Sequence, residues 1–132
     1  MENVKRTCGA FILLAILVVF AGCRAPESLD VRLSGDKVIG MRKGQVLNLE
    51  LKANPTTGYI WDLSGLSDSG VLRRIGKYKY IRESDLIGAG GTQIFRFEAR
   101  KKGQEKLTFR YGRPWEENKE PAKIYKVRII VH

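Results

Sequence analysis

Apolar and polar residues alternate along most of the chain beyond position 28. Because alternate side chains of a strand point to opposite faces, this period of two indicates half-buried strands, whereas an amphipathic helix would need a period near 3.6. Some segments alternate strictly, and others are shorter apolar runs between turn-forming residues. The predicted strands are residues 29–33, 37–41, 47–51, 59–63, 71–80, 95–99, 107–111 and 125–131. No segment offers a convincing helix, so the pattern predicts an all-β domain.

Clusters of Gly, Asn and Ser separate the predicted strands, which is typical of a β-sandwich or a β-barrel. The chain of 132 residues contains no internal repeat and no low-complexity linker, and its length suits a single hydrophobic core. We therefore predict one domain over residues 29–132, an immunoglobulin-like β-sandwich of about seven or eight strands.

The N-terminal region has the features of an export signal. Lys5 and Arg6 precede thirteen consecutive small or apolar residues, from Ala10 to Gly22. A transmembrane helix needs about 20 apolar residues, so this run is short for a membrane span but fits the apolar part of a signal peptide. We therefore predict a signal peptide over residues 1–22.

The residues around Cys23 resemble the lipobox of bacterial lipoproteins, in which cleavage leaves a diacylated cysteine as the first mature residue. The two small residues before Cys23 fit that pattern, whereas Phe20 stands where leucine is usual. On this interpretation Cys23 is lipidated, residues 23–28 form a tether, and the protein is exported to the periplasm and anchored in the cell envelope. Arg24 after the lipidated cysteine favours the outer membrane if the cell is Gram-negative. The alternative is an ordinary secretory signal, with Cys23 left as a thiol.

The chain is basic, with 24 Lys and Arg residues, 14 Asp and Glu residues and a formal net charge of +10. These basic residues are spread along the sequence, and the predicted export separates the protein from the genome, so we predict no nucleic-acid partner. A solvated basic surface explains the charge better. Weak attraction to anionic lipid or to acidic partners is the alternative.

The set of reactive side chains argues against an enzyme. The only histidine is His132 at the last position, and the two cysteines are Cys8, in the predicted signal, and the predicted lipid site Cys23. No serine lies in a nucleophile motif, and no cluster of His and Cys predicts a metal site. The glycine-rich segment at 88–91 lacks the lysine and the helix of a phosphate-binding loop. We therefore predict a nonenzymatic protein without a cofactor or a metal.

Three segments between predicted strands have the composition of binding loops: Asn54-Pro55-Thr56-Thr57-Gly58-Tyr59, Gly88-Ala89-Gly90-Gly91 and Arg113-Pro114-Trp115. An even number of strands separates each pair, so all three are expected at the same end of the sandwich. Pro and Gly stiffen the first tip, the glycines of the second leave backbone groups open to another chain, and Trp and Arg are enriched at binding hot spots. Taken singly, each segment also fits an ordinary turn, a flexible loop or a core tryptophan.

Together and in this order, the three segments resemble the motifs of the chagasin family of cysteine peptidase inhibitors: NPTTG followed by an aromatic residue, then GxGG, then RPW or RPF. The resemblance spans residues 36–131, and Tyr59 in place of phenylalanine is the only visible variation in the first motif. It implies an immunoglobulin-like sandwich that inhibits papain-like cysteine peptidases reversibly and noncovalently.

The resemblance also implies a role for each motif. The first covers the catalytic cysteine and histidine of the peptidase, the second runs along the non-primed substrate side, and the third packs its aromatic residue against the primed-side wall. The residues expected to bind the peptidase are Asn54, Pro55, Thr56, Thr57, Gly58, Tyr59, Gly88, Gly90, Gly91, Arg113, Pro114 and Trp115.

The expected partner is therefore a papain-like cysteine peptidase, either from the same organism or from a host, bound by a monomeric inhibitor. The alternative is a nonenzymatic envelope or adhesion module that uses the same loops on a nonpeptidase partner. Titration of papain distinguishes the two hypotheses.

Overall fold

The computed structural model describes residue 22 and residues 24–132. The predicted signal peptide, apart from Gly22, and the predicted lipid site Cys23 therefore lie outside the described residues. Along the described chain, no helix is long and apolar enough to cross a membrane. The first strand begins at Ser28.

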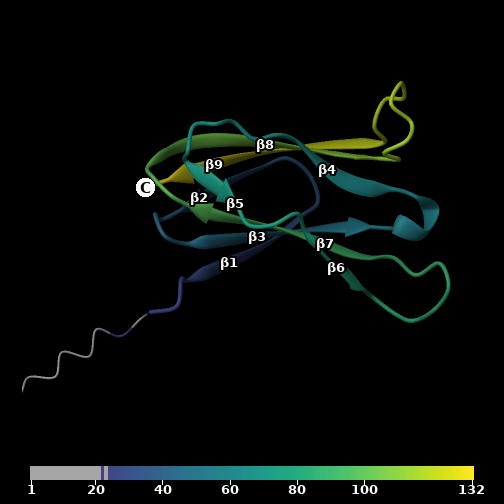
Figure 1. Cartoon of the computed structure of the whole chain (residues 1–132), viewed down its shortest axis with the longest axis horizontal. Helices are drawn as coiled ribbons and strands as arrows, with labels where there is room; N and C mark the ends of the chain where they lie inside the picture. Colours follow the sequence, from purple (N-terminus) through teal and green to yellow (C-terminus); the bar gives the residue numbers. More distant parts are fainter. Residues whose placement is uncertain (1–21, 23) are drawn as a thin grey trace, which may run out of the picture.

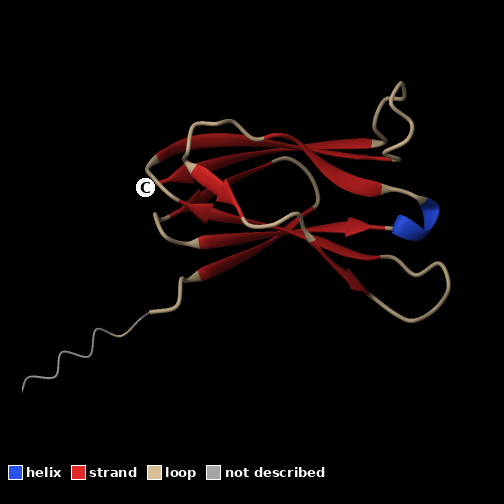
Figure 2. Ribbon diagram, in the orientation of Figure 1, coloured by secondary structure: helices blue, strands red, loops and turns tan. Residues whose placement is uncertain are grey.

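In the described part of the chain, nine strands form the two sheets of a sandwich, shown in Figures 1 and 2. The first sheet has the order β1-β3-β7-β5, with β6 also paired to β7, and consists of β1 (Ser28–Leu33), β3 (Val46–Ala53), β5 (Leu72–Arg74), β6 (Lys79–Arg82) and β7 (Gly91–Ala99). The second has the order β2-β9-β8-β4 and consists of β2 (Lys37–Met41), β4 (Ile60–Gly65), β8 (Gly103–Gly112) and β9 (Lys123–Val131). A single turn of 3₁₀ helix, η1 (Pro55–Thr57), follows β3. The predicted all-β, immunoglobulin-like sandwich is confirmed.

The core lies between the two sheets and is built from alternate strand positions. Leu47, Leu49 and Leu51 of β3 are fully buried, which confirms the inward face that the sequence alternation predicts. Phe95 of β7 packs across the sandwich against Phe109 of β8, with ring centroids 5.0 Å apart in an edge-on arrangement. Each of these side chains contributes about 1.5–3 kcal/mol through burial, so the core holds the two sheets, and thereby the loops between them, in a fixed relation.

One predicted strand is two strands in the structure, which raises the number from the expected seven or eight to nine. The segment 71–80 is interrupted after β5, where Gly76 adopts a left-handed backbone with φ of +67°, and resumes as β6. Both parts pair with β7, Arg74 opposite Phe97 and Lys79 opposite Ile94. The edge therefore has five residue steps between these two pairs, whereas β7 has three, so the edge contains two additional residues here. Gly76 in the middle of the predicted strand was the signal for such a break.

Three connections emerge at one end of the sandwich, on the right in Figure 1. The central loop (residues 54–59) crosses from β3 in the first sheet to β4 in the second. It is flanked by the glycine loop (residues 83–90), which joins β6 to β7 within the first sheet, and by the tryptophan loop (residues 113–122), which joins β8 to β9 within the second. The placement of all three at one end, expected from strand counting, is confirmed.

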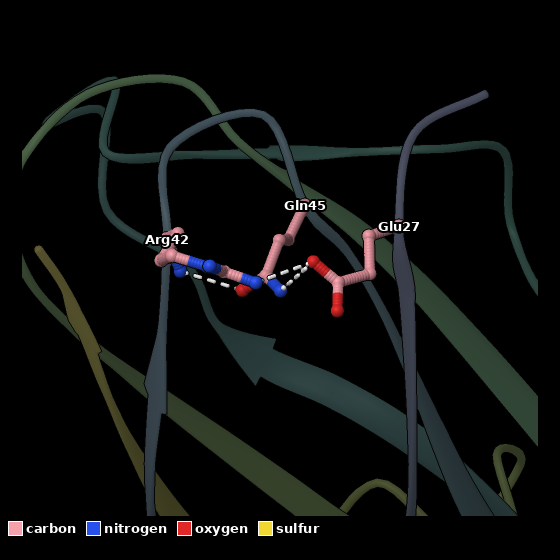
Figure 3. A network of polar contacts seen from close by, with 3 residues as sticks. All are labelled: Glu27, Arg42 and Gln45. Atoms are coloured by element: carbon pink, nitrogen blue, oxygen red, sulfur yellow. Dashed lines mark hydrogen bonds and ion pairs between the residues drawn. The ribbon is translucent and has the colours of Figure 1, made fainter. Parts of the chain in front are cut away.

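The segment that leads into β1 is fastened at the opposite end. Figure 3 shows the Glu27 carboxylate accepting hydrogen bonds from the Arg42 guanidinium and the Gln45 side-chain amide, at 2.5 and 3.0 Å. The backbone N–H of Val46 donates to the Glu27 carbonyl oxygen at 3.0 Å. Because β1 is parallel to β3, and β3 runs from this point to the central loop, the chain enters the domain at the end away from the loops.

Candidate functional site

The central loop is held in one conformation by its own backbone. Pro55 occupies the first turn of η1, where its fixed φ is compatible with the helix, and Gly58 ends the turn in the left-handed region with φ of +84°. The backbone N–H and the hydroxyl of Thr57 both donate to the Asn54 carbonyl oxygen, at 3.1 and 2.7 Å. Thr56 and Thr57 are left exposed at the tip. The loop is thus a closed turn that presents its two threonines to solvent.

The tryptophan loop is interlocked with the central loop. Arg113 donates from Nε to the Thr57 carbonyl oxygen at 3.1 Å, and its guanidinium lies 4.7 Å from the centre of the Tyr59 ring. The Trp115 indole covers Gly58 so closely that a Cβ built on this glycine would lie 2.2 Å from Cη2 of the indole. Gly58 is therefore required both by its backbone angle and by Trp115. The indole is still 67% exposed, so its other face is open to a partner.

The glycine loop is joined to the central loop by a weaker contact. Asn54 donates from its side-chain amide to the Gly88 carbonyl oxygen, at a long 3.4 Å. Within the loop, the Glu83 N–H donates to the Gly90 carbonyl and the Ala89 N–H donates to the Leu86 carbonyl, both at 3.1 Å. Gly88 has φ of +82° with no neighbour within 4 Å of an added Cβ, so it serves the turn and leaves open space beside it.

The prediction that Gly91 lies on an open loop is wrong. Gly91 is the first residue of β7, is buried, and pairs with β3 on one side and β6 on the other. A Cβ at this position would lie 2.3 Å from the Ile81 carbonyl oxygen, so glycine is required by the close approach of the two strands. Of the three expected glycines, only Gly88 and Gly90 lie on the loop.

The site predicted from the sequence did not include two exposed apolar residues of the glycine loop. Leu86 is 77% exposed and Ile87 is 106% exposed, so the Ile87 side chain stands fully in solvent at the loop tip. Their signal in the sequence was an apolar pair inside an otherwise polar and glycine-rich stretch. With Trp115 at the other side of the central loop, apolar surface flanks the two threonines on both sides.

Beneath the loops, a buried amide joins the two sheets. The side chain of Gln93, in β7, accepts from the Trp61 N–H at 2.7 Å and donates to the Trp61 carbonyl at 3.2 Å, although Trp61 lies in β4 of the opposite sheet. Gln93 has no solvent exposure. Nearby, the Tyr111 hydroxyl accepts from the Asn54 N–H at 3.2 Å. These bonds tie the strands that carry the loops to each other, and a fully bonded buried polar pair of this kind fixes their relative position.

The tryptophan loop also carries a small charge network. The Glu116 carboxylate lies 3.2 Å from Lys119 Nζ and 3.5 Å from an Arg113 guanidinium nitrogen. The hydrogen bond from Lys119 lowers the pKa of Glu116, partial burial opposes this, and the positive charges of Lys119 and Arg113 lower the pKa further, with a net result below the ordinary value. Among the described residues, no group of three potential ligands could hold a metal ion. The site offers contact surface and backbone groups, without reactive side chains.

A family model, that of the Chagasin family peptidase inhibitor I42, matches residues 40–129. The chain belongs to the chagasin family of peptidase inhibitors. The match runs from β2 to β9 and includes all three loops. Family membership confirms the resemblance drawn from the three motifs, and it identifies an inhibitor and not an enzyme.

Similarity to individual chagasin-type proteins is low in sequence and clear in fold. Chagasin of Trypanosoma cruzi is 31% identical over 75 residues, which are 54% of this chain and 68% of that protein. The crystal structure of a cysteine protease inhibitor from Entamoeba histolytica is similar with a TM-score of 0.67 at 19% identity, over 81% of this chain and 99% of that one. PbICP-C, solved in complex with falcipain-2, has a TM-score of 0.58 at 17% identity, over 80% and 99%. Since both solved chains are matched over nearly their full length, this sandwich folds as a complete unit in them.

Proposed function

We propose that the three loops block the active-site cleft of a papain-like cysteine peptidase, and that the protein acts as a reversible, noncovalent, monomeric inhibitor. Family membership supports the class of target. One observation carries the mechanism: the three motif-bearing loops form a single edge in which the central loop is closed on itself and locked by Arg113 and Trp115. An edge that is ordered before binding loses little conformational entropy when it enters a cleft.

The position of each loop determines which part of the peptidase cleft it would contact. The central loop protrudes between the two sheets with exposed Thr56 and Thr57, and it would cover the catalytic cysteine and histidine. The glycine loop would lie along the non-primed side with Leu86 and Ile87, and the open face of Trp115 would pack on the primed side. An edge of this kind buries about 1,600 Å² in total, which is sufficient for a tight complex when it is preordered.

Titration of papain with the segment 25–132 tests this function. This segment contains both sheets and every described core residue, and its solved relatives consist of little more than this sandwich. We expect reversible inhibition at a one-to-one ratio, with no effect on the serine peptidase trypsin. Absence of inhibition of papain and of a cathepsin at micromolar concentrations would contradict the proposal and favour an envelope or adhesion module.

We further propose that the protein is exported and anchored in the cell envelope through lipidated Cys23. The support is the apolar run at 10–22 followed by two small residues and cysteine. The fold is compatible with such an anchor, because the chain enters the domain at the end opposite the loops. Two acyl signals or more are needed for stable anchoring, and a diacylated, N-acylated cysteine provides them.

Membrane fractionation of the full chain and of Cys23→Ser tests the anchor. The native protein should sediment with membranes, and the variant should not be processed as a lipoprotein. A wholly soluble native protein with an unmodified thiol at residue 23 would contradict the anchor and leave the inhibitor function untouched.

A further inference from the structure

The outward faces of the two sheets carry their positive charges differently. On the sheet that contains β3 and β7, several cations are paired: Arg32 lies 3.7 Å from Glu50, and Arg73 lies 2.6 Å from Glu98. Arg96 of the same face donates to an Asn48 side chain at 3.2 Å. Carboxylates therefore lie among the cations of this face and partly balance their charge.

The other sheet has an outward face whose cations lack such partners, which we call the basic face and define by four exposed residues: Lys106, Arg110, Lys126 and Arg128. None of the four is within 4.0 Å of a carboxylate oxygen in the described part of the chain. The acids nearest to them in the strand pairing are Asp62, opposite Arg110, and Asp36, which accepts from the Lys126 backbone N–H. The face thus carries a clear positive excess.

The strand register places like charges of the basic face next to each other, which is unfavourable when no partner covers the face. Lys106 of β8 lies directly opposite Arg128 of β9, and Lys126 is diagonal to Lys106 through the Thr108 pair. Directly opposite residues in antiparallel strands have Cβ atoms about 5 Å apart, so like charges at these positions repel each other. A negatively charged surface laid against the face would relieve this repulsion, which gives the face an electrostatic reason to bind one.

Apolar side chains on the same face indicate which kind of anionic surface fits. Val38 of β2 is paired with Arg128 and is 61% exposed, and Ile124 of β9 is paired with Arg110 and is 47% exposed. Four strands give a platform about 15 Å wide. Exposed apolar side chains among cations suit a lipid interface, where the charges meet headgroups and the apolar groups enter the boundary with the acyl chains.

We propose that the basic face docks the domain onto the surface of an anionic lipid bilayer. This contact is separate from the three loops, which lie at one end of the sandwich while the basic face lies along its side. It does not depend on Cys23, because every residue invoked belongs to the folded domain. Each cation near an anionic membrane strengthens binding about five-fold, and this attraction falls when salt shortens the screening length.

The test measures sedimentation of segment 25–132 with vesicles of phosphatidylcholine mixed with phosphatidylglycerol, and with vesicles of phosphatidylcholine alone. We expect binding to the mixed vesicles, release by salt, and no binding to the neutral ones. The variant Lys106→Gln/Arg128→Gln should bind about 25-fold more weakly, since two cations are removed. Inhibition of papain by the same variant should be unchanged, which also shows that it is folded.

The matched control is Arg32→Gln/Lys79→Gln, which lowers the net charge equally but on the other outward face. The affinity of this variant for the mixed vesicles should stay within about two-fold of the wild-type affinity, because charges on the far side of the domain are screened from the membrane. Equal losses in both variants would show that only net charge matters and would overturn the proposal. Binding to heparin in solution without binding to the mixed vesicles would overturn it as well, since the face would then serve a soluble polyanion.

Discussion

The glycine loop and the tryptophan loop flank the same central loop, but they are attached to it in different ways. Arg113 and Trp115 reach the central loop through a hydrogen bond of 3.1 Å, a stacked guanidinium and a packed indole. The glycine loop reaches it through one exposed bond of 3.4 Å from Asn54. One half of the edge is therefore fastened to the central loop more firmly than the other. In the proposed mechanism, the firmly held half would provide affinity at low entropic cost, and the other half would adjust to the surface of the peptidase.

The largest expected effect comes from breaking the interlocked half at Gly58. Gly58→Ala must accommodate a Cβ in a left-handed backbone and also displace Trp115. These costs sum to about 3 kcal/mol, so inhibition of papain should weaken roughly 100-fold. The matched control is Gly44→Ala, because Gly44 has a similar φ of +88° in a turn at the other end with open space around it. Its inhibition constant should not change, and equal losses in both variants would mean that backbone strain alone is responsible.

Trp115→Ala should have the second largest effect. Removing an exposed aromatic anchor costs about 2 kcal/mol of binding, or roughly 30-fold in the inhibition constant, with little change in thermal unfolding. Phe97→Ala provides the contrast, because Phe97 is fully buried and its truncation should cost about 3–5 kcal/mol of folding stability. If calorimetry shows that both variants destabilise the fold equally, Trp115 belongs to the core and the interlocked half is misassigned.

The adjustable half should respond to loss of apolar surface at its tip. Ile87→Ser should weaken inhibition about ten-fold through the apolar area that no longer becomes buried, and it should leave the unfolding transition unchanged because the side chain is fully exposed. Val38→Ser, at another exposed apolar position on the side of the sandwich, should leave inhibition unchanged. The loss at Ile87 should also differ between papain and a cathepsin; identical losses would argue against adaptation by this loop.

The smallest expected effect is a dependence of stability on pH at Glu116. Its pKa is lowered in the folded protein, so it stabilises the fold fully above the ordinary glutamate pKa of about 4.3, and this contribution is lost as pH falls through the lowered value. Urea unfolding of wild type and Glu116→Gln should therefore show a small difference near neutral pH that disappears in acid. A difference that grows in acid would reverse the sign and contradict the network with Lys119 and Arg113.

Much of the fold followed from local pattern. The alternation at Leu47, Leu49 and Leu51 determined the inward face of β3, and strand counting alone placed the three loops at one end. These predictions succeeded because side-chain periodicity and chain direction are properties of each strand and do not depend on its neighbours. The exact division of segment 71–80 into β5 and β6 could not be predicted in the same way, because it depends on how the edge accommodates two more residues than the facing part of β7.

The site was predicted in part. The motifs identified the central loop and Trp115, but a motif does not show that the indole covers Gly58, since that contact joins residues 57 positions apart. Gly91 was assigned to the open loop because glycine in a sequence looks the same whether it serves a turn or the close approach of two strands. Leu86 and Ile87 were missed because apolar residues near a strand are ordinarily expected to be buried.

The buried bond between Gln93 and Trp61 has a consequence for how the loop end moves. The Trp61 amide hydrogen is held by a side chain of the opposite sheet, so it can exchange with deuterium from solvent only when the two sheets separate at this point. The exchange rate of this amide therefore reports how often the sandwich opens beneath the loops. A bound peptidase that contacts loops from both sheets should slow the exchange of this amide without contacting Trp61.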